Sequence, residues 1–318
     1  MTRFLLRRLI FVLISLWIII SATFFLMRAV PGGPFSAEKK VPVEILKTLE
    51  AHYGLDKPLV MQYFDYVKSV VTWDLGPSFR YKAETVNDII NRTFKISLVL
   101  GLEALFLSIA LGVFFGVLAA LYHNKFQDYS AMVIAVIGMS VPSFILAVFL
   151  QYVFAIQLDV FPAGRFETPM HHVLPALSLS ALPIAFIARL TRSNMLEVLQ
   201  QDYIKTARAK GLKESIVLIK HAIRNAILPV VTYLGPLTAG ILTGSFVVEN
   251  IYGIPGLGTQ FVQSITNRDY TVIMGTTVFY SIILVFMVFV VDMLYGIIDP
   301  RIKIAGGEVT GGDVNEYS

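Results

Sequence analysis

Few residues of this sequence could do covalent chemistry, and the familiar catalytic patterns are absent. None of the 318 residues is a cysteine, which excludes disulfides, thiol redox centres and cysteine nucleophiles. The sequence contains no G-x-x-x-x-G-K-[ST] phosphate loop, no H-E-x-x-H zinc pair and no G-x-S-x-G nucleophile turn. The glycine-rich piece 253–258 lacks the phosphate-binding lysine, so we interpret it as a tight turn. We therefore expect a non-catalytic chain that holds neither a cofactor nor a metal ion.

Two acidic residues interrupt long apolar runs. Glu103 lies in the run from Ile96 to Tyr122, and Asp292 lies near the end of the last run. A carboxylate at the centre of a membrane helix costs about 2.5–3.5 kcal/mol, so both side chains should face protein or water. Glu103 could hold the α-amino group of a peptide in a pathway, or it could pair with a neighbouring helix, and both readings stay open. For Asp292 the structural role is favoured.

Other polar and proline residues in the apolar runs are weaker candidates. Pro142, Pro183 and Pro236 could free backbone carbonyls and form hinges, although most such prolines are kinks accommodated by packing. Ser140 and Pro142 join Glu103 and Asp292 as candidate pathway or gating residues. The adjacent His171 and His172 diverge on a helix, so we expect them at the membrane–water boundary and not as a metal pair.

The composition is that of a membrane protein. Hydrophobic residues make up 56% and charged residues 15% of the chain, against about 25% charged in soluble domains. Too few polar side chains remain to cover a water-facing surface, and the apolar content excludes disorder. The net charge of +4 is weak evidence for a nucleic-acid partner, because the basic residues lie between apolar runs. We predict an all-α integral membrane protein surrounded by lipid, with no nucleic-acid partner.

Six apolar runs approach or exceed the roughly 20 residues needed to cross a bilayer. The first could be a signal peptide, but its apolar core is too long and no A-x-A site follows, so we expect a retained helix. The fourth is the least secure because it is short and contains Pro175 and Pro183. The predicted spans are 9–28, 97–122, 130–156, 173–191, 227–248 and 271–297.

The basic residues assign a side to each loop. Arg3, Arg7 and Arg8 precede the first span, and the segment 192–226 is rich in Lys and Arg. The positive-inside rule places the N-terminus, this segment and the tail 299–318 in the cytoplasm. The end of that tail is expected to be disordered. The long loop 29–95 then lies outside.

The outer loop is long enough to fold. We predict short helices over Val43–Tyr53 and Lys57–Val71, the second started by Pro58. These would form a small extracytoplasmic helical cap after the first span.

The cytoplasmic segment contains a short predicted helix. Asp202 is a candidate N-cap, and Gly211 suits a left-handed helix stop. The small residues between them would let another protein approach closely. The alternative is a solvated basic loop, and physical reasoning alone rates the two about equally.

This segment resembles the cytoplasmic loop of binding-protein-dependent ABC importer permeases. The resemblance is carried by D-Y-I-K-T-A-R-A-K-G-L at 202–212, K-H-A-I-R-N-A at 220–226, and Pro229. In the wider family the loop begins Glu-Ala-Ala, with a Gly four residues after the second Ala. In this chain those positions hold Lys205, Thr206, Ala207 and Gly211. The departures at the first two positions, Lys205 and Thr206, are typical of the peptide and nickel branch.

Further motifs extend the resemblance over nearly the whole chain, except the last dozen residues. P-G-G-P at 31–34, Y-G-L-D-K-P at 53–58 and W-D-L-G-P at 73–77 are similar to the B-type subunits of oligopeptide permeases. G-I-P-G-L-G at 253–258, R-D-Y at 268–270 and D-P-R at 299–301 are also similar to the branch.

The resemblance implies a fold and a set of partners. It implies six transmembrane helices of the type I ABC importer permease kind in a bacterial plasma membrane. A second six-span permease, two ATPase subunits that carry ATP and Mg, and an extracytoplasmic peptide-binding protein would complete the importer. The helix at 203–210 would be the coupling helix that sits in a groove of the ATPase. The implied ATPase-coupling residues are Asp202, Tyr203, Lys205, Thr206, Ala207, Arg208, Ala209 and Gly211.

The implied function is ATP-driven uptake of oligopeptides. Dipeptides, nickel or another small solute remain alternatives within the family. A rival from another class is a proton-coupled secondary transporter, with Glu103 and Asp292 as relay groups. Secondary transporters often contain internal repeats. We find no convincing repeat, and six spans are few for such a protein working alone.

The coupling assignment predicts a phenotype. A bulky residue in place of Gly211 or Ala207 should abolish uptake and leave the protein in the membrane, because a partner could no longer approach the helix. Transport assays with membrane-fraction immunoblots check this, and normal uptake by both variants would contradict the assignment.

Overall fold

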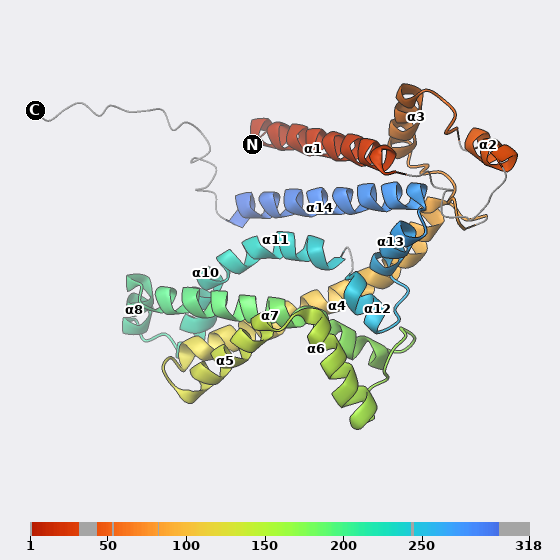
Figure 1. Ribbon diagram of the computed structural model, residues 1–318. Coiled ribbons are helices and arrows are strands. Elements are labelled where there is room, and N and C mark those ends of the chain that lie inside the picture. The colour runs from red at the N-terminus through yellow and green to blue at the C-terminus, as the bar shows by residue number, and fades with distance from the viewer. Residues whose placement is uncertain (1, 32–42, 53, 82, 243–244, 299–318) are drawn as a thin grey trace, which may run out of the picture.

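The computed structural model describes residues 2–31, 43–52, 54–81, 83–242 and 245–298, and its regular structure in these ranges is helical (Figure 1). Within these ranges an isolated antiparallel β-bridge joins Pro77 to Thr85. The helices are α1 Thr2–Ala29, α2 Val43–His52, α3 Leu59–Val71, α4 Val86–Leu121, α5 Phe126–Ser140, α6 Ser143–Leu150, α7 Pro169–Leu199, α8 Asp202–Ala209, α9 Glu214–Ile216, α10 Arg224–Ala226, α11 Leu228–Leu242, α12 Phe246–Ile251, α13 Leu257–Thr266 and α14 Tyr270–Ile298. Two π-helices, η1 Gln151–Gln157 and η2 Val217–Ile223, continue α6 and α9.

Four of these helices, α1, α4, α7 and α14, are each long and apolar enough to cross a membrane. Two bent pairs pass the same test together: 126–140 with 143–157, bent by 106°, and 214–226 with 228–238, bent by 49°. Counting each bent pair as one span gives up to six in the part of the chain that the structure describes, which is the number predicted.

The helix ends depart from the predicted spans where capping overrides hydropathy. The apolar run predicted as 97–122 belongs to a helix that starts at Val86, because Thr85 and Asp88 form a capping box there. The uncertain fourth span lies in the 31-residue α7, which includes both Pro175 and Pro183. The span predicted as 227–248 contains α11, which ends at Leu242, and the start of a separate α12. The predicted tail 299–318 lies outside the described residues.

The apolar run predicted as 130–156 is broken in two. Val141 is extended, and Pro142 is the N-cap of α6, so α5 ends at Ser140. The residue before a proline is forced out of the helical region, and this produces the sharp bend.

A stripe of small side chains on α4 lets α7 approach closely. A Cβ on Gly116 would lie 2.5 Å from Thr191 Cβ and 2.6 Å from the Ala188 carbonyl oxygen. Apolar association is weak inside a bilayer, so close van der Waals packing must hold such helices together. The buried small residues of α4 that repeat every four positions are Ala104, Ser108, Gly112, Gly116 and Ala120.

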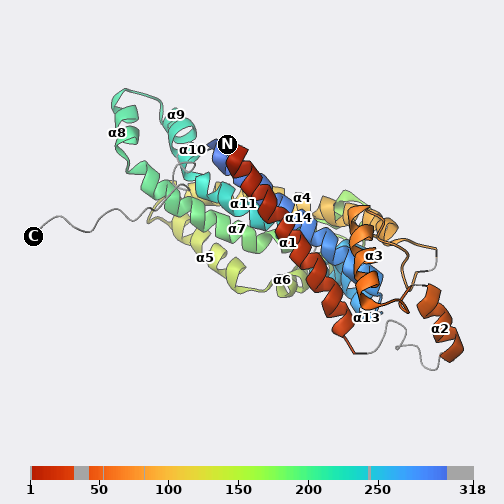
Figure 2. The same cartoon turned by 90° about the horizontal axis from the view of Figure 1, so that it is seen from above.

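The cap predicted after the first span packs on α1 and α14 at the end of the molecule opposite α8 (Figures 1 and 2). Both predicted cap helices form, as α2 and as α3 after the N-cap Pro58. Phe24 of α1 is buried and stacks with Tyr66 of α3 at 5.6 Å between ring centroids. The buried Asp269, just before α14, accepts hydrogen bonds from Ser78 Oγ and from the Phe79 amide. The cap is therefore fixed to both helices.

The tight α4–α7 contact predicts a sensitivity to one added carbon. Gly116→Ala should lower the thermal midpoint of the purified chain, because overpacking costs about 1–3 kcal/mol and a backbone carbonyl cannot move aside. Gly240→Ala is the control, since a Cβ there would meet nothing within 4 Å. Equal midpoints for the two variants would contradict the close packing.

Candidate coupling segment and polar sites

The segment after α7 forms a short amphipathic helix, α8, which packs on η2 in an apolar cluster that includes the ends of α4 and α7. Ile204 and Ala207 lie three residues apart on α8 and are 0% and 6% exposed. Burial of this face removes apolar surface from water and seats α8 on the body of the chain. The buried partners in this cluster are Ala120, Met195, Val217, Ala222 and Ala226.

The start of α8 differs from the prediction. Gln201 is the N-cap and makes no side-chain capping bond, while Asp202 is the first helical residue. The carboxylate of Asp202 accepts a hydrogen bond from Lys205 Nζ at 2.9 Å, and this bond lowers the pKa of Asp202. The prediction that Asp202 caps the helix was wrong. Its acid instead lies in the first turn, where the helix dipole favours negative charge.

The end of α8 matches the predicted left-handed stop. Gly211 has φ +75°, its amide donates to the Arg208 carbonyl at 2.9 Å, and the Leu212 amide donates to the Ala207 carbonyl at 3.4 Å. These two bonds form a Schellman motif. A side chain at Gly211 would have open space around its Cβ, so the requirement for glycine is conformational and not steric.

The outer face of α8 is exposed and held in a fixed orientation. Arg208 pairs with Glu214 of α9 at 2.6 Å. The Tyr203 hydroxyl accepts a hydrogen bond from Asn225 Nδ2 of α10 at 3.0 Å. Of the eight predicted coupling residues, Ala207 faces the body of the chain. The residues exposed on or directly after α8 are Asp202, Tyr203, Lys205, Thr206, Arg208, Ala209 and Gly211.

An ion pair between the buried Asp128 and the partly exposed Arg192 joins the start of α5 to α7. Asp128, 1% exposed near the start of α5, accepts hydrogen bonds from Arg192 Nε and Nη2 at 2.5 and 2.7 Å. The Asn124 amide also donates to Asp128, at 2.9 Å. Removing one partner of such a pair typically costs 3–5 kcal/mol, because the other charge stays buried. The pair ties the α4–α5 connection to α7.

Glu103 has a partner on a neighbouring helix. Its Oε1 lies 2.8 Å from Nδ1 of His172 on α7, and the His172 ring stacks on Phe166 with 3.7 Å between centroids. This contact agrees with the hypothesis that Glu103 pairs with a polar group on a neighbouring helix. The second carboxylate oxygen, Oε2, is shielded from solvent and has no hydrogen-bond partner among the described residues. The adjacent His171 diverges as predicted, and its ring bonds to Thr168.

The other candidate pathway residues lie elsewhere. Ser140 and Pro142 are exposed at the break between α5 and α6, and Ser140 Oγ donates to the Val136 carbonyl at 2.8 Å. No hydrogen bond or ion pair joins Ser140 to Glu103 within the described ranges. Asp292 belongs to α14, but its side chain lies outside the described residues.

A buried glutamate between the predicted spans 227–248 and 271–297 organises the junction of α12 and α13. Glu249 is 0% exposed. Its Oε1 accepts a hydrogen bond from Ser97 Oγ of α4 at 2.7 Å, and its Oε2 accepts one from the Thr259 amide at 2.9 Å. Thr259 is in the first turn of α13, where free amides suit an anion. In the sequence, the position of Glu249 among Val, Ile and Gly residues could have indicated that its side chain is buried.

The glycine-rich piece wraps around this carboxylate. A Cβ on Gly256 would lie 2.5 Å from both Glu249 Cδ and Ser97 Oγ, and one on Gly258 would lie 2.8 Å from the Phe246 amide nitrogen. Gly253, at φ +62°, ends α12. The piece is thus a turn, as predicted. Gly256 and Gly258 are required by close approach to neighbouring atoms, and Gly253 by its positive φ.

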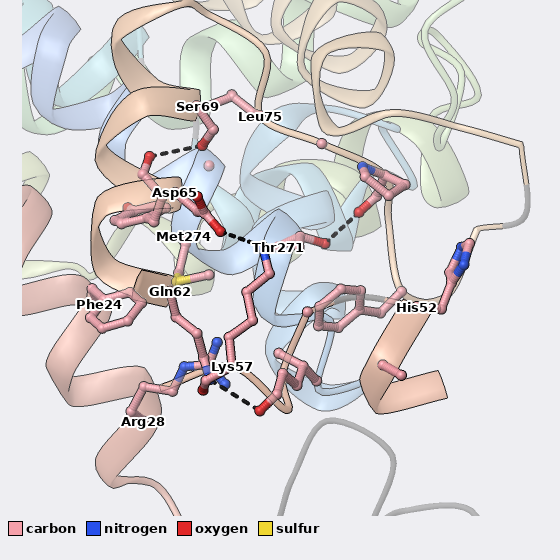
Figure 3. Close-up of a pocket in the computed structure, with 18 residues that line it drawn as sticks. Phe24, Arg28, His52, Lys57, Gln62, Asp65, Ser69, Leu75, Thr271 and Met274 are labelled. Carbon is pink, nitrogen blue, oxygen red and sulfur yellow. Dashed lines mark hydrogen bonds and ion pairs between the residues drawn. The ribbon is translucent and has the colours of Figure 1, made fainter. Parts of the chain in front are cut away.

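A cavity of about 420 Å³ with mixed polar and apolar walls lies under the cap, between α1, α3 and α14 (Figure 3). Lys57 pairs with Asp65 at 2.7 Å on its wall, and Arg28 and Gln62 also line it. No group of three or more His, Asp or Glu side chains is placed to hold a metal ion in the part of the chain that the structure describes.

The Glu249 junction predicts a pH dependence. Burial raises the pKa of this carboxyl above its ordinary 4.5, against the opposing hydrogen bonds from Ser97 and Thr259. The folded chain then binds the proton more tightly than the unfolded chain, so this group's contribution to stability falls as pH rises from 4.5 through the raised pKa. Wild type should lose thermal midpoint relative to Glu249→Gln over that window. Glu197→Gln, on the exposed α7 surface, should show no such difference. A pH-independent difference between wild type and Glu249→Gln would contradict the sign.

Comparison with known proteins identifies the fold. A crystal structure of an amino acid ABC transporter with histidines aligns with a TM-score of 0.52 at 17% identity, covering 66% of this chain and 94% of that one. The MetNI methionine ABC transporter, in inward-facing conformations, aligns with a TM-score of 0.53 at 17% identity, covering 66% and 96%. The chain has the type I ABC importer permease fold, as predicted.

Sequence comparison extends the match over nearly the full length. The chain is 51% identical to the dipeptide transport system permease protein DppB of Bacillus subtilis, over 96% of this chain and 99% of that protein. It is 43% identical to the oligopeptide transport system permease protein OppB of Escherichia coli, over 95% and 100%. Residues 1–100 match the model described as "Binding-prot-dependent transport system membrane comp, N-term". Residues 112–304 match "Binding-protein-dependent transport system inner membrane component", and the chain belongs to that family.

Proposed function

We propose that this chain is the transmembrane permease subunit of an ATP-driven, binding-protein-dependent importer of oligopeptides. The observation that carries the proposal is the similarity, over nearly the full length, to permeases named for peptides. Because relatives named for dipeptides and for oligopeptides both match, dipeptides are the alternative substrate. The chain would form half of the pathway and leave ATP hydrolysis to its partners.

The geometry of α8 supports a coupling role. Its inner face packs on η2 and shares one apolar cluster with the ends of α4 and α7, so a force on α8 would be passed through η2 to that helix pair. Its outer face, with Tyr203, Lys205 and Arg208, is free to sit in a groove of a cytoplasmic ATPase. ATP and Mg would bind on two such ATPase subunits. Their closure would then switch the permease between inward- and outward-facing states.

The other parts follow from this orientation. With α8 in the cytoplasm, both termini lie there and the α2–α3 cap lies outside, where a peptide-binding protein would deliver substrate. A second six-span permease would supply the other half of the pathway in a bacterial plasma membrane. Glu103 is a candidate acceptor for a peptide amino group, with His172 holding its Oε1. Its Oε2 is shielded from solvent, so the side chain would have to move to reach a substrate. Ser140 and Pro142, at the break in the third span, and Asp292 are retained as gating candidates.

Two leucine substitutions on one helix separate docking from folding. Ala209→Leu, on the exposed face, should leave the thermal midpoint unchanged but reduce ATPase retention and uptake by at least about tenfold, which is about 1.4 kcal/mol of docking energy. Ala207→Leu overpacks the buried face and should lower the thermal midpoint as well. Transport assays, pull-downs and melting curves measure these effects. Wild-type uptake by Ala209→Leu with the ATPase still bound would refute docking on this face.

Mild-detergent purification with mass spectrometry tests the assembly itself. A P-loop ATPase and a second permease should co-purify with the chain. A chain that purifies alone, with uptake that persists without ATP but collapses with a protonophore, would favour proton-coupled transport instead.

A further inference from the structure

A basic pocket of about 630 Å³ lies where the polar segment after α8 enters the apolar helix α11. Its polar wall comes from η2 and α10, and its apolar wall comes from Ile227 and the first turn of α11. The residues that line it are Lys220, His221, Arg224, Asn225, Ile227, Leu228 and Val231. A cationic rim and an apolar floor therefore meet in one hollow.

The two strong cations of this pocket have no acidic partner among the described residues. Lys220 and Arg224 are exposed and lie four residues apart, where like charges repel on a helical surface. The nearby acids are already used, since Asp202 pairs with Lys205 and Glu214 pairs with Arg208. An anion between Lys220 and Arg224 would relieve the repulsion.

The position of the pocket selects the kind of anion. The chain bends by 49° between 214–226 and 228–238, so the cations lie at the point where a polar helix turns into an apolar span. Ile227, Leu228 and Val231 belong to that apolar end, so the same pocket offers cations to a headgroup and apolar surface to an acyl chain. Basic pockets at the cytoplasmic ends of membrane helices bind anionic headgroups.

We propose that this pocket binds an anionic phospholipid. Lys220, His221 and Arg224 surround its phosphate, and an acyl chain lies along Ile227, Leu228 and Val231. The site adjoins α8 through Asn225, whose amide donates to the Tyr203 hydroxyl. Lipid in the pocket would therefore stabilise the position of α10, which holds α8 through this hydrogen bond.

The test is lipid binding by the full chain, purified with whatever partners it retains. Native mass spectrometry should show about tenfold higher occupancy by phosphatidylglycerol than by phosphatidylcholine with identical acyl chains. The double variant Lys220→Gln/Arg224→Gln should lose this preference, and Lys220→Arg/Arg224→Lys should keep it. Lys210→Gln/Lys213→Gln is the charge-matched control, because both lysines are exposed and lie outside the pocket.

Each outcome decides the proposal, and none depends on uptake. Equal binding of the two lipids by wild type, or an unchanged preference in a folded Lys220→Gln/Arg224→Gln protein, would overturn it. A site filled by inorganic phosphate but not by phosphatidylglycerol would be a free-anion site and would also overturn it. Phosphatidylglycerol that binds only after partner subunits are removed would show that a protein covers the pocket in the assembly, and would overturn the proposal. Glycerol 1-phosphate that displaces the lipid only at far higher concentration would support the contribution of the apolar floor.

Discussion

The close contact between α4 and α7 is the constraint on which the rest of the structure depends. A stripe of Ala, Ser and Gly on α4 brings the Thr191 side chain within 2.5 Å of where a Cβ on Gly116 would stand. Lipid tails are as apolar as the side chains, so only contact this close gains enough dispersion energy to favour the pair over lipid. Both ends of the pair then carry the polar features: Glu103–His172 at one end, and the Asp128–Arg192 bridge with α8 at the other.

The buried acids share one solution to the cost of burial. Asp128 is met by a guanidinium, Glu249 by a serine hydroxyl and a helix amide, and Asp269 by Ser78 Oγ and the Phe79 amide. Each acid joins elements far apart in the chain, and its partners replace the water that it loses. These contacts fix which elements meet, a specificity that apolar packing alone provides poorly in a membrane.

The segment around α8 combines rigid and exposed parts. Its inner face is continuous with the α4–α7 packing, and its outer face is held in orientation by Arg208–Glu214 and Tyr203–Asn225. A helix fixed on one side and open on the other can transmit displacement with little loss, which is the property that a coupling element needs. The basic pocket proposed for a phospholipid is lined by residues of η2, α10 and α11, and η2 and α10 both contact α8.

What the sequence by itself determined was whatever depends on local composition and local backbone geometry. Apolar runs predicted the membrane class and the number of spans, and Gly211 predicted a left-handed stop because few residues except glycine accept that φ at low cost. The tertiary structure alone decided which way side chains face and what they meet. Ala207 faces inward because α8 packs on η2 in one apolar cluster with the ends of α4 and α7. Glu249 is buried because Ser97, 152 residues away, lies against it. Neither contact leaves a periodic trace in the sequence, since a long-range partner is chosen by the packing of whole helices and not by neighbours in the chain.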